Sequence, residues 1–271
     1  MLAEDSGTLI PLEESFYDCF KNVCSRHPNN IALVCRHQRH DHLRQRPAES
    51  TGTEDCLRWA YSELYQAAES LAARWHTLGI RKGSRIVALL RSGAEWVATF
   101  YATVLLGCTF VPVNPALASK PDHLAHQIRL ATPSVMLVED VAMVEQLEEN
   151  ADQLQLHNCV LRMIAGRPDV ASPPKSWAYL EDLLSASREQ HSEGVDLELD
   201  SPSLDDLLLI IFTSGTTSKP RGVRHSYRSW CASVLAYDST GDPRRACANL
   251  PLFHSFGILA LTKPCVTAGL C

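Results

Sequence analysis

The sequence predicts an α/β fold in which mostly parallel sheets are flanked by helices. Helix-like segments, with apolar residues at steps of three or four, alternate along the chain with short and almost wholly apolar runs. Such runs are typical of strands that are buried on both faces, and their alternation with helices is typical of parallel sheets. With 271 residues and 45% apolar content, the chain is long enough for one large or two smaller domains with a substantial core.

The first clear helix is indicated by apolar residues at Tyr61, Leu64, Ala68, Leu71, Trp75 and Leu78. We expect Ser62 to be its N-cap, because a serine oxygen accepts a hydrogen bond from a free N–H group of the first turn. Gly79 is expected to end the helix, since glycine readily adopts the left-handed conformation that follows many helices. Residues 85–90 are then predicted to form a buried strand.

Residues 94–113 form the one stretch long enough to suggest a membrane span. Glu95, a glycine and a proline interrupt it, which disfavours that interpretation. We expect instead a buried helix over 93–106, begun by an S-x-x-E capping box of Ser92 and Glu95 and ended by Gly107. The rest of the stretch is predicted to be a strand.

The alternation continues beyond this strand. We predict a helix over 123–131, a strand over 134–138, a helix over 141–149 and strands over 159–164 and 207–212. Three segments are less regular. Residues 37–56 are expected to form an insertion loop, 167–175 a proline-containing connector and 189–206 an acidic surface loop.

Composition and charge narrow the function classes. A net charge of −6 without a basic tract argues against nucleic acid or an anionic membrane as a partner. The start of the chain, MLAEDSGTLIPLEES, is acidic and lacks the basic and apolar pattern of a secretory signal. We therefore expect a cytoplasmic protein, with the peroxisome left open.

Ten cysteines are scattered along the chain without a C-x-x-C pair. This distribution favours reduced thiols over a disulfide framework or a zinc site. Residues of ligand type do cluster at Cys35, His37, His40 and His42. Because that cluster runs into a polar, arginine-rich stretch, we interpret it as part of the insertion loop and predict no metal site there.

The most informative segment is residues 212–223, FTSGTTSKPRGV, which follows a predicted strand and leads into a further strand and helix. Its hydroxyl groups supply hydrogen-bond donors, its lysine and arginine supply positive charge, and no carboxylate interrupts it. Gly215 and Gly222 are expected to adopt backbone conformations closed to other residues and to leave main-chain N–H groups open to a ligand. This composition indicates a phosphate-binding loop.

Two common nucleotide-binding loops do not fit the segment. A Walker A loop needs G-x-x-x-x-G-K-[ST], but no Lys-Ser or Lys-Thr pair follows the second glycine here, and a Rossmann G-x-G-x-x-G is absent as well. An ordinary kinase or P-loop NTPase is therefore disfavoured. A plain Ser/Thr/Gly surface turn is the remaining alternative, and the density of donors between two strands argues against it.

The loop resembles the signature of the adenylate-forming ligases, a family of AMP-dependent enzymes that includes acyl-CoA and aryl-CoA synthetases, luciferases and the adenylation domains of nonribosomal peptide synthetases. Three further stretches resemble family motifs in order and spacing: WAYSEL at 59–64, LLGCTFVPVNPAL at 105–117 and LPLFHSFGI at 250–258. Together the four stretches span most of the chain. The resemblance implies that the chain is the N-terminal portion of such an enzyme.

The resemblance implies a two-step reaction. A carboxylic acid is joined to the α-phosphate of ATP, and the acyl group then passes to the thiol of coenzyme A or of a carrier-protein phosphopantetheine, with Mg²⁺ as a further cofactor. The implied cradle for the β- and γ-phosphates is Thr213, Ser214, Gly215, Thr216, Thr217, Lys219, Arg221 and Gly222. Arg221 replaces a usual lysine and Ser218 a usual glycine, so the charge is kept while the geometry of the contact is expected to differ.

The resemblance also places His254 beside the acyl pocket, between Phe253 and Phe256. The spacing of the two phenylalanines would put both rings on one side of a short helix, against an apolar acyl or aryl group. A packed, hydrogen-bonded core histidine is the alternative for His254. Fatty, aromatic and amino acids are all compatible with these motifs as substrates.

The motifs that follow LPLFHSFGI in this family cannot be located here. They are an acidic motif that binds magnesium and adenine, a ribose-binding aspartate, a hinge and a lid domain with a catalytic lysine. We therefore expect residues 1–271 to be a truncated AMP-binding domain without its lid, inactive in adenylation and poorly stable alone. The favoured hypothesis is a fragment of an ATP-dependent acid–thiol ligase; the alternative is a non-catalytic remnant that binds nucleotide or a partner protein through its apolar end at 266–271.

Overall fold

The computed structural model describes residues 14–39, 42–43, 56–167, 172–184, 200–213, 219–236 and 250–269. Its centre is a seven-stranded sheet in the order β7-β6-β5-β3-β4-β8-β9. The strands are β3 (Arg85–Leu89), β4 (Thr109–Pro112), β5 (Val135–Val138), β6 (Leu161–Ile164), β7 (Ala178–Tyr179), β8 (Leu207–Phe212) and β9 (Gly222–Ser226). All neighbours pair in parallel except β8 and β9, which are antiparallel. The predicted α/β fold is confirmed.

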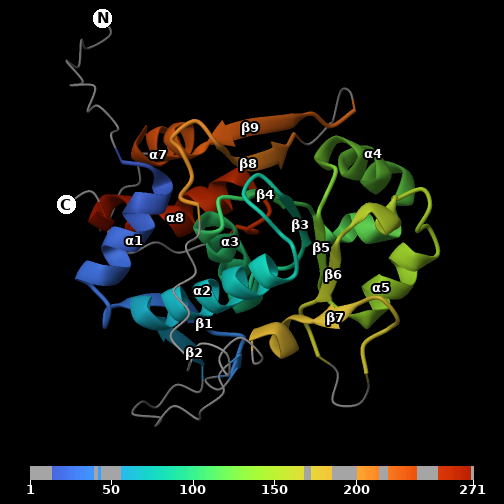
Figure 1. Cartoon of the computed structure of the whole chain (residues 1–271), viewed down its shortest axis with the longest axis horizontal. Helices are drawn as coiled ribbons and strands as arrows, with labels where there is room; N and C mark the ends of the chain where they lie inside the picture. The colour runs from blue at the N-terminus through green and yellow to red at the C-terminus, as the bar shows by residue number, and fades with distance from the viewer. Residues whose placement is uncertain are drawn as a thin grey trace, which may run out of the picture.

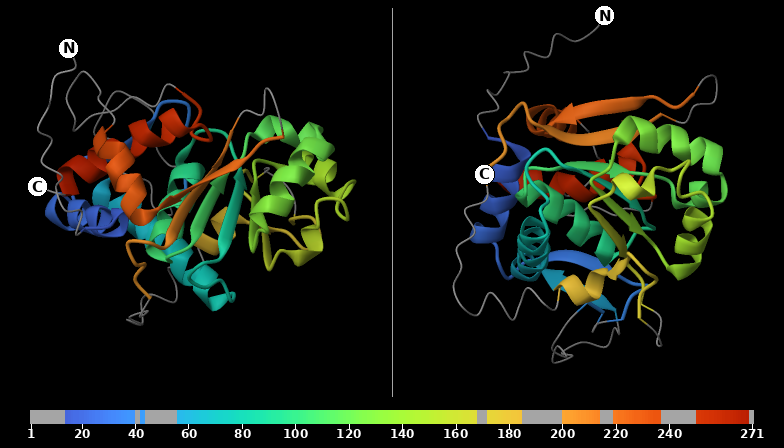
Figure 2. Two further views of the ribbon diagram at one scale, coloured as in Figure 1. Left: turned by 90° about the horizontal axis from the view of Figure 1, so that it is seen from above. Right: turned by 45° about the vertical axis from the view of Figure 1, so that its right-hand side comes forward.

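Helices cover both faces of this sheet (Figure 1). One layer contains α1 (Phe16–Arg26), α2 (Tyr61–Thr77), α3 (Ala94–Leu105), α7 (Tyr227–Ala236) and α8 (Ser255–Gly269), and the other contains α4 (Pro121–Ala131) and α5 (Val141–Glu148). Figure 2 shows the sheet between these two layers. A small antiparallel sheet of β1 (Ile31–Cys35) and β2 (Leu57–Ala60) lies beside α2. Short 3₁₀ turns are found at Pro115–Ser119 and Leu156–Asn158.

The central strands are buried on both faces, which accounts for their almost wholly apolar sequences. In β3, Ile86 and Ala88 pack into the core shared with α2 and α3, while Val87 and Leu89 pack into the core shared with α4 and α5. All four side chains are fully buried. Since successive residues of a strand point to opposite faces, a strand between two helical layers has no solvent-facing position.

The predicted elements are found within two residues of their expected limits, and the start of α2 differs in its cap. The N-cap is Ala60, whose N–H donates to the Glu63 carboxylate at 2.8 Å, so the prediction of Ser62 is wrong. Ser62 is the second residue of the helix and donates its backbone N–H to the Pro28 carbonyl instead. Gly79 has φ +92° just after the helix, as predicted.

The predicted capping box at the start of α3 is also wrong. The N-cap is Gly93, and the N–H of Ala94 donates to the Gln38 side-chain oxygen at 2.9 Å. A residue distant in the sequence thus provides the cap. The Ser92 hydroxyl accepts a hydrogen bond from the Leu252 N–H instead, and the Glu95 carboxylate binds Gln38 and His42. The helix ends before Gly107, which has φ +65°. Within the described ranges, no helix is long and apolar enough to cross a membrane.

Several elements were not predicted, namely α1, β1, β2 and β7. Much of the expected insertion loop at 37–56, the connector at 167–175 and the surface loop at 189–206 lies outside the described residues. Cys247 and Cys271 also lie outside them, and no disulfide bond joins any two of the eight described cysteines.

The last described helix packs against the first one. Val266 is fully buried, and Asn22 and Arg26 of α1 donate side-chain hydrogen bonds to the Gly269 carbonyl. A Cβ atom at Gly269 would lie 2.4 Å from the Cys19 carbonyl oxygen, so only glycine allows this approach. The expectation of an exposed apolar end is therefore wrong for residues 266–269, while 270 and 271 lie outside the described part.

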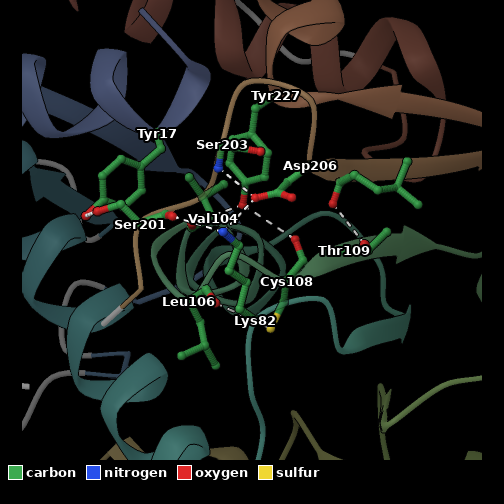
Figure 3. A network of polar contacts seen from close by, with 11 residues as sticks. Tyr17, Lys82, Val104, Leu106, Cys108, Thr109, Ser201, Ser203, Asp206 and Tyr227 are labelled. Carbon is green, nitrogen blue, oxygen red and sulfur yellow. Dashed lines mark hydrogen bonds and ion pairs between the residues drawn. The ribbon is translucent and has the colours of Figure 1, made fainter. Parts of the chain in front are cut away.

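A polar network fixes the start of β8 at the amino edge of the sheet (Figure 3). Lys82 Nζ forms an ion pair with Asp206 at 2.8 Å and donates to the Ser201 carbonyl at 3.1 Å. The Thr109 hydroxyl donates to the Leu207 carbonyl at 2.8 Å, and the buried Tyr227 hydroxyl donates to the Val104 carbonyl at 3.1 Å. This network joins β8 to the turn between α3 and β4.

Candidate functional site

The loop predicted to bind phosphate leaves the sheet at the opposite end of β8. We call Thr213, Lys219, Pro220 and Arg221 the loop base. The Thr213 N–H donates to the Arg221 carbonyl at 2.9 Å, and the Arg221 N–H donates to the Thr213 hydroxyl oxygen at 3.1 Å. The hydroxyl uses only its oxygen in this contact, so its own proton remains available to a ligand.

Both cationic side chains of the loop are exposed at this base, Lys219 on one side of Pro220 and Arg221 on the other. Neither faces a carboxylate in any contact of the described residues. Ser214, Gly215, Thr216, Thr217 and Ser218 lie outside the described residues. Thr213, Lys219, Arg221 and Gly222 are thus the predicted phosphate-binding residues that the structure places together.

Gly222 has a role other than the predicted one. It begins β9 opposite Phe212 and does not have the positive φ of Gly79, Gly83 and Gly107. A Cβ atom there would lie 2.8 Å from the Ile210 side chain on the neighbouring strand. Glycine is therefore required for close packing across the hairpin and not for an unusual backbone conformation.

A histidine absent from the sequence predictions contacts the loop base. His126 of α4 lies 2.9 Å through Nε2 from the Pro220 carbonyl oxygen. Because a carbonyl oxygen only accepts, Nε2 must carry the proton in this contact. The sequence offered no signal for it, since the two residues are distant in the chain and the helix pattern alone does not indicate what a half-buried histidine faces.

The second predicted group, around His254, lies at the same edge of the sheet. The Leu252 N–H donates to the Ser92 hydroxyl oxygen at 3.1 Å, and Ser92 belongs to the loop after β3. Strands β3, β4 and β8 are parallel neighbours in that order. At about 4.8 Å between neighbouring strands, the carboxyl ends of β3 and β8 are about 10 Å apart.

His254 and Phe256 have their rings nearly parallel, with centroids 6.0 Å apart. Both residues are exposed, Phe256 by 50%. Phe253 precedes the helix, which begins at Ser255, so the prediction that both phenyl rings share one side of a short helix is wrong. His254 is therefore an exposed residue beside an aromatic ring, and the alternative of a buried core histidine is excluded.

The turn before α8 depends on close backbone packing. The His254 N–H donates to the Pro251 carbonyl at 3.0 Å. A Cβ atom at Gly257 would lie 2.3 Å from the same oxygen. Glycine in the motif LPLFHSFGI thus allows the first turn of α8 to approach the segment that carries His254.

A buried carboxylate supports this edge from the side of α3. The Glu95 side chain is 13% exposed, forms an ion pair with His42 and accepts a hydrogen bond from the Gln38 amide at 2.7 Å. Burial opposes the ionisation of Glu95. The hydrogen bond and charge of His42, together with the hydrogen bond from Gln38, nevertheless bring the pKa of Glu95 below its usual value. His42 of the predicted ligand-like cluster is thus an ion-pair partner, and His40 lies outside the described residues.

Glu139 follows β5 at the same edge and has the opposite electrostatic character. Its carboxylate accepts a hydrogen bond from the Arg91 N–H at 2.7 Å, and its carbonyl accepts one from the Gly166 N–H at 2.8 Å. Burial raises the pKa of the carboxyl, the contacts with Arg91 lower it, and the negative charges of Glu95 and Asp140 raise it further. Neutral Glu139 is therefore favoured relative to a solvated glutamate.

The described residues thus form a site at the carboxyl edge of a parallel sheet. In open α/β sheets this edge is where ligands bind. The loop after β8 supplies a hydroxyl and two exposed cations, and His254 and Phe256 at the start of α8 supply aromatic rings. The loop after β3 joins the segment before α8 to the sheet through Ser92, and joins the end of β5 through Arg91. Such an edge suits a ligand with both an anionic and an apolar part.

Fold and site together describe an α/β domain with exposed cations at the carboxyl edge of its sheet. The family model described as AMP-binding enzyme matches residues 20–271, and the chain belongs to this family. It is 31% identical over 214 residues to an indoleacetate–CoA ligase from Aromatoleum aromaticum, covering 78% of this chain and 39% of that protein. A 4-coumarate–CoA ligase 1 from Arabidopsis thaliana is 26% identical over 246 residues, with 88% of this chain and 39% of that protein covered.

Solved structures agree with the fold. The crystal structure of the anthranilate CoA ligase AuaEII in complex with anthranoyl-AMP superposes with a TM-score of 0.74 at 19% identity. The alignment covers 96% of this chain and 44% of that one. The chain therefore spans about two fifths of the length of these relatives.

Proposed function

We propose that this chain provides the ATP-phosphate grip of an AMP-forming acid–thiol ligase. The observation that carries the proposal is the β8–β9 hairpin, whose base holds the Thr213 hydroxyl, Lys219 and Arg221 at the carboxyl edge of the sheet. Membership of the AMP-binding enzyme family supports a nucleotide as the ligand. Because Lys219 and Arg221 face no carboxylate among the described residues, the phosphates of the nucleotide are favoured as their partners over its base or sugar.

The proposed reaction has two steps. A carboxylate oxygen of the acid attacks the α-phosphorus of ATP, the bond from that phosphorus to the bridging oxygen breaks, and pyrophosphate leaves with its electron pair. A thiol of coenzyme A or of a carrier-protein phosphopantetheine then attacks the acyl carbon and releases AMP. The loop base acts in the first step by holding the β- and γ-phosphates, so that the leaving pyrophosphate is positioned and its charge is stabilised.

Mg²⁺ is implied by this chemistry, and the described residues of the loop base do not suit it. Their donors are a hydroxyl and two cations, whereas Mg²⁺ prefers carboxylates, phosphates and water. In the proposed reaction these residues therefore hold phosphate and no metal.

The acyl group is proposed to bind near His254 and Phe256. Their stacked, exposed rings form an apolar surface at the same edge as the loop base. The relatives named above are ligases of indoleacetate and 4-coumarate, and AuaEII is a ligase of anthranilate. We propose a carboxylic acid with an apolar or aromatic body as the substrate class.

The phosphate grip is tested by titrating the 271-residue protein with ATP, AMP and inorganic tripolyphosphate in a calorimeter. ATP and tripolyphosphate should both bind, and Arg221→Ala should weaken each about ten- to a hundredfold, the range expected for loss of a charge-assisted contact. Arg224→Ala is the matched control, because Arg224 is also exposed on β9 but lies beyond the loop base. It should change either affinity less than twofold.

Equal effects of the two arginine substitutions would show general charge attraction and refute a grip at the loop base. The ligase reaction has a separate test, exchange of labelled pyrophosphate into ATP that depends on added carboxylic acid. Nucleotide binding without such exchange, in a protein that contains this chain within a full-length ligase, would favour the non-catalytic alternative.

A further inference from the structure

We propose that His126 is a positioning residue that fixes the loop base by holding the Pro220 carbonyl. The inference rests on the proposed function for its consequence in ATP binding, but the contact itself belongs to the described structure. His126 Nε2 and the Pro220 oxygen are 2.9 Å apart. The partner of the Pro220 carbonyl thus belongs to α4 and lies outside the loop motif at 212–223.

The hairpin ladder alone cannot hold Pro220. The last strand pair is Phe212 with Gly222, and the hydrogen bonds beyond it join Thr213 and Arg221. Pro220 lies one residue further into the loop and has no N–H to donate. The His126 contact therefore adds Pro220, the neighbour of Lys219, to the hydrogen-bonded residues of the loop base.

Helix α4 is a rigid support for this contact. Leu124, Ala125 and Ile128 are buried in the core between α4 and the sheet. The C-terminal end of the helix is tied to β3, because the Arg85 guanidinium donates to the Ala131 carbonyl at 2.9 Å. His126 is half-buried on the face toward β9, so its ring has little freedom to leave the Pro220 oxygen.

Protonation does not break the contact. A neutral ring with its proton on Nε2 and a doubly protonated ring both donate from Nε2, and the carbonyl accepts from either. Charge on His126 would add to the positive field of Lys219 and Arg221. The contact thus serves an anion-binding loop in both protonation states of the ring.

The consequence for the ligand follows from geometry. Lys219 and Arg221 flank Pro220, so releasing its carbonyl lets both cations spread over more positions. Holding them in place lowers the entropy that ATP binding must remove. His126 should therefore contribute to affinity for the β- and γ-phosphates without touching them.

His126→Met is the main test, since methionine has similar length, favours helix and cannot donate a hydrogen bond. His126→Gln keeps an N–H donor at a similar reach. His123→Met on the same helix is the matched control. His123 is exposed, and among the described residues the hydrogen bond to the Pro220 carbonyl comes from His126 and not from His123.

The first readout is amide hydrogen exchange without nucleotide. In His126→Met, exchange should become about two- to tenfold faster at the N–H groups of Thr213 and Arg221 and unchanged in β3 and β5. His126→Gln should restore the slow exchange, and His123→Met should not alter it. Unchanged exchange at the loop base in His126→Met would overturn the proposal.

The second readout is the affinity for ATP and AMP. His126→Met should weaken ATP binding about two- to tenfold and leave AMP, which lacks the β- and γ-phosphates, unchanged. An equal loss for both ligands, or faster exchange across the whole sheet, would show a general structural role and reject positioning. If no variant and not even the parent binds ATP, the proposed function fails while the exchange measurement still decides the role of His126.

Discussion

Two carboxylates at opposite edges of the seven-stranded sheet, Asp206 and Glu139, have pKa values displaced in opposite directions. At the amino edge, the hydrogen bond from Lys82 is the largest cause that lowers the pKa of Asp206. At the carboxyl edge, burial is the largest cause that raises the pKa of Glu139. The environment of Asp206 thus favours its charged form, as that of Glu95 does at the carboxyl edge, whereas a charged Glu139 costs stability.

The difference between the two edges extends to their other polar and charged groups. At the amino edge the polar side chains of Thr109 and Tyr227 are buried and donate within the chain. At the carboxyl edge Lys219 and Arg221 are exposed and His254 presents its ring to solvent. The polar groups of the amino edge bond within the chain and anchor the strands, whereas the carboxyl edge leaves cations and an aromatic ring exposed, as the proposed phosphate and acyl sites require. Functional edges commonly contain such residues, held by a scaffold that is stabilised elsewhere.

The carboxyl edge depends on close backbone packing at the first turn of α8. Gly257→Ala would place a Cβ atom 2.3 Å from the Pro251 carbonyl oxygen, and neither backbone can yield easily. We expect a loss of about 2–4 kcal/mol in the free energy of unfolding, the largest effect predicted here. Urea unfolding followed by circular dichroism measures it.

Gly93→Ala serves as the control for this substitution. Its Cβ would meet only the side chains of Glu95 and Gln38, at 2.9 and 3.2 Å, and Gly93 has an extended backbone that alanine adopts. Gly93→Ala should lower the free energy of unfolding clearly less than Gly257→Ala does. Equal losses would mean that the turn before α8 can shift to accept a Cβ atom, and that close backbone packing there is not required.

A threonine hydroxyl bonds to the main chain at each end of β8, that of Thr109 at its start and that of Thr213 just beyond its end. Replacing each threonine by valine compares the two edges of the sheet directly. Thr109→Val leaves the Leu207 carbonyl without its buried hydroxyl donor and should cost about 1–2 kcal/mol of stability, with ATP affinity unchanged. Thr213→Val removes an exposed hydroxyl that accepts from the Arg221 N–H. It should cost less than about 1 kcal/mol but weaken ATP binding about two- to tenfold.

Thermal unfolding and calorimetric titration of the two variants in parallel give both quantities. If Thr109→Val weakens ATP binding as much as Thr213→Val does, the two ends of the strand are coupled. The separation of an anchoring edge from a binding edge would then be rejected.

The sequence predicted the sheet well because its central strands are buried on both faces. Runs such as that at 207–212 can satisfy no other common environment than the interior of a layered sheet. Gly79 and Gly107 were also predictable, since each ends a helix with a positive φ. These features depend on local sequence and on burial alone.

The site was predicted less completely, because its contacts join residues far apart in the chain. Ser92 and Glu95 have the spacing of a capping box, yet Ser92 accepts from Leu252 and Glu95 binds His42 and Gln38. A local motif cannot show that tertiary partners compete for the same oxygens. For the same reason neither the cap provided by Gln38 nor the contact of His126 with Pro220 could be read from the sequence.

The smallest expected effects come from the two displaced carboxylates, and their signs differ. Asp206 has a lowered pKa, so its contribution to stability is present above the unfolded value, about 3.9, and is lost as the pH falls through the folded value. Asp206→Asn should lower stability at pH 7 by less than about 1 kcal/mol, because the pair with Lys82 is partly exposed.

Glu139 has a raised pKa, so its contribution is present below the unfolded value, about 4.3, and is lost as the pH rises through the folded value. Glu139→Gln removes the charge, and the Gln oxygen can still accept from the Arg91 N–H. The variant should therefore have a higher Tm than the parent at pH 7, and the difference should shrink toward zero below pH 4. Melting curves of both variants and the parent between pH 3.5 and 8 test the signs. A lower Tm for Glu139→Gln at pH 7 would mean that the ionised carboxylate stabilises the carboxyl edge, and the contrast between the two edges would not hold.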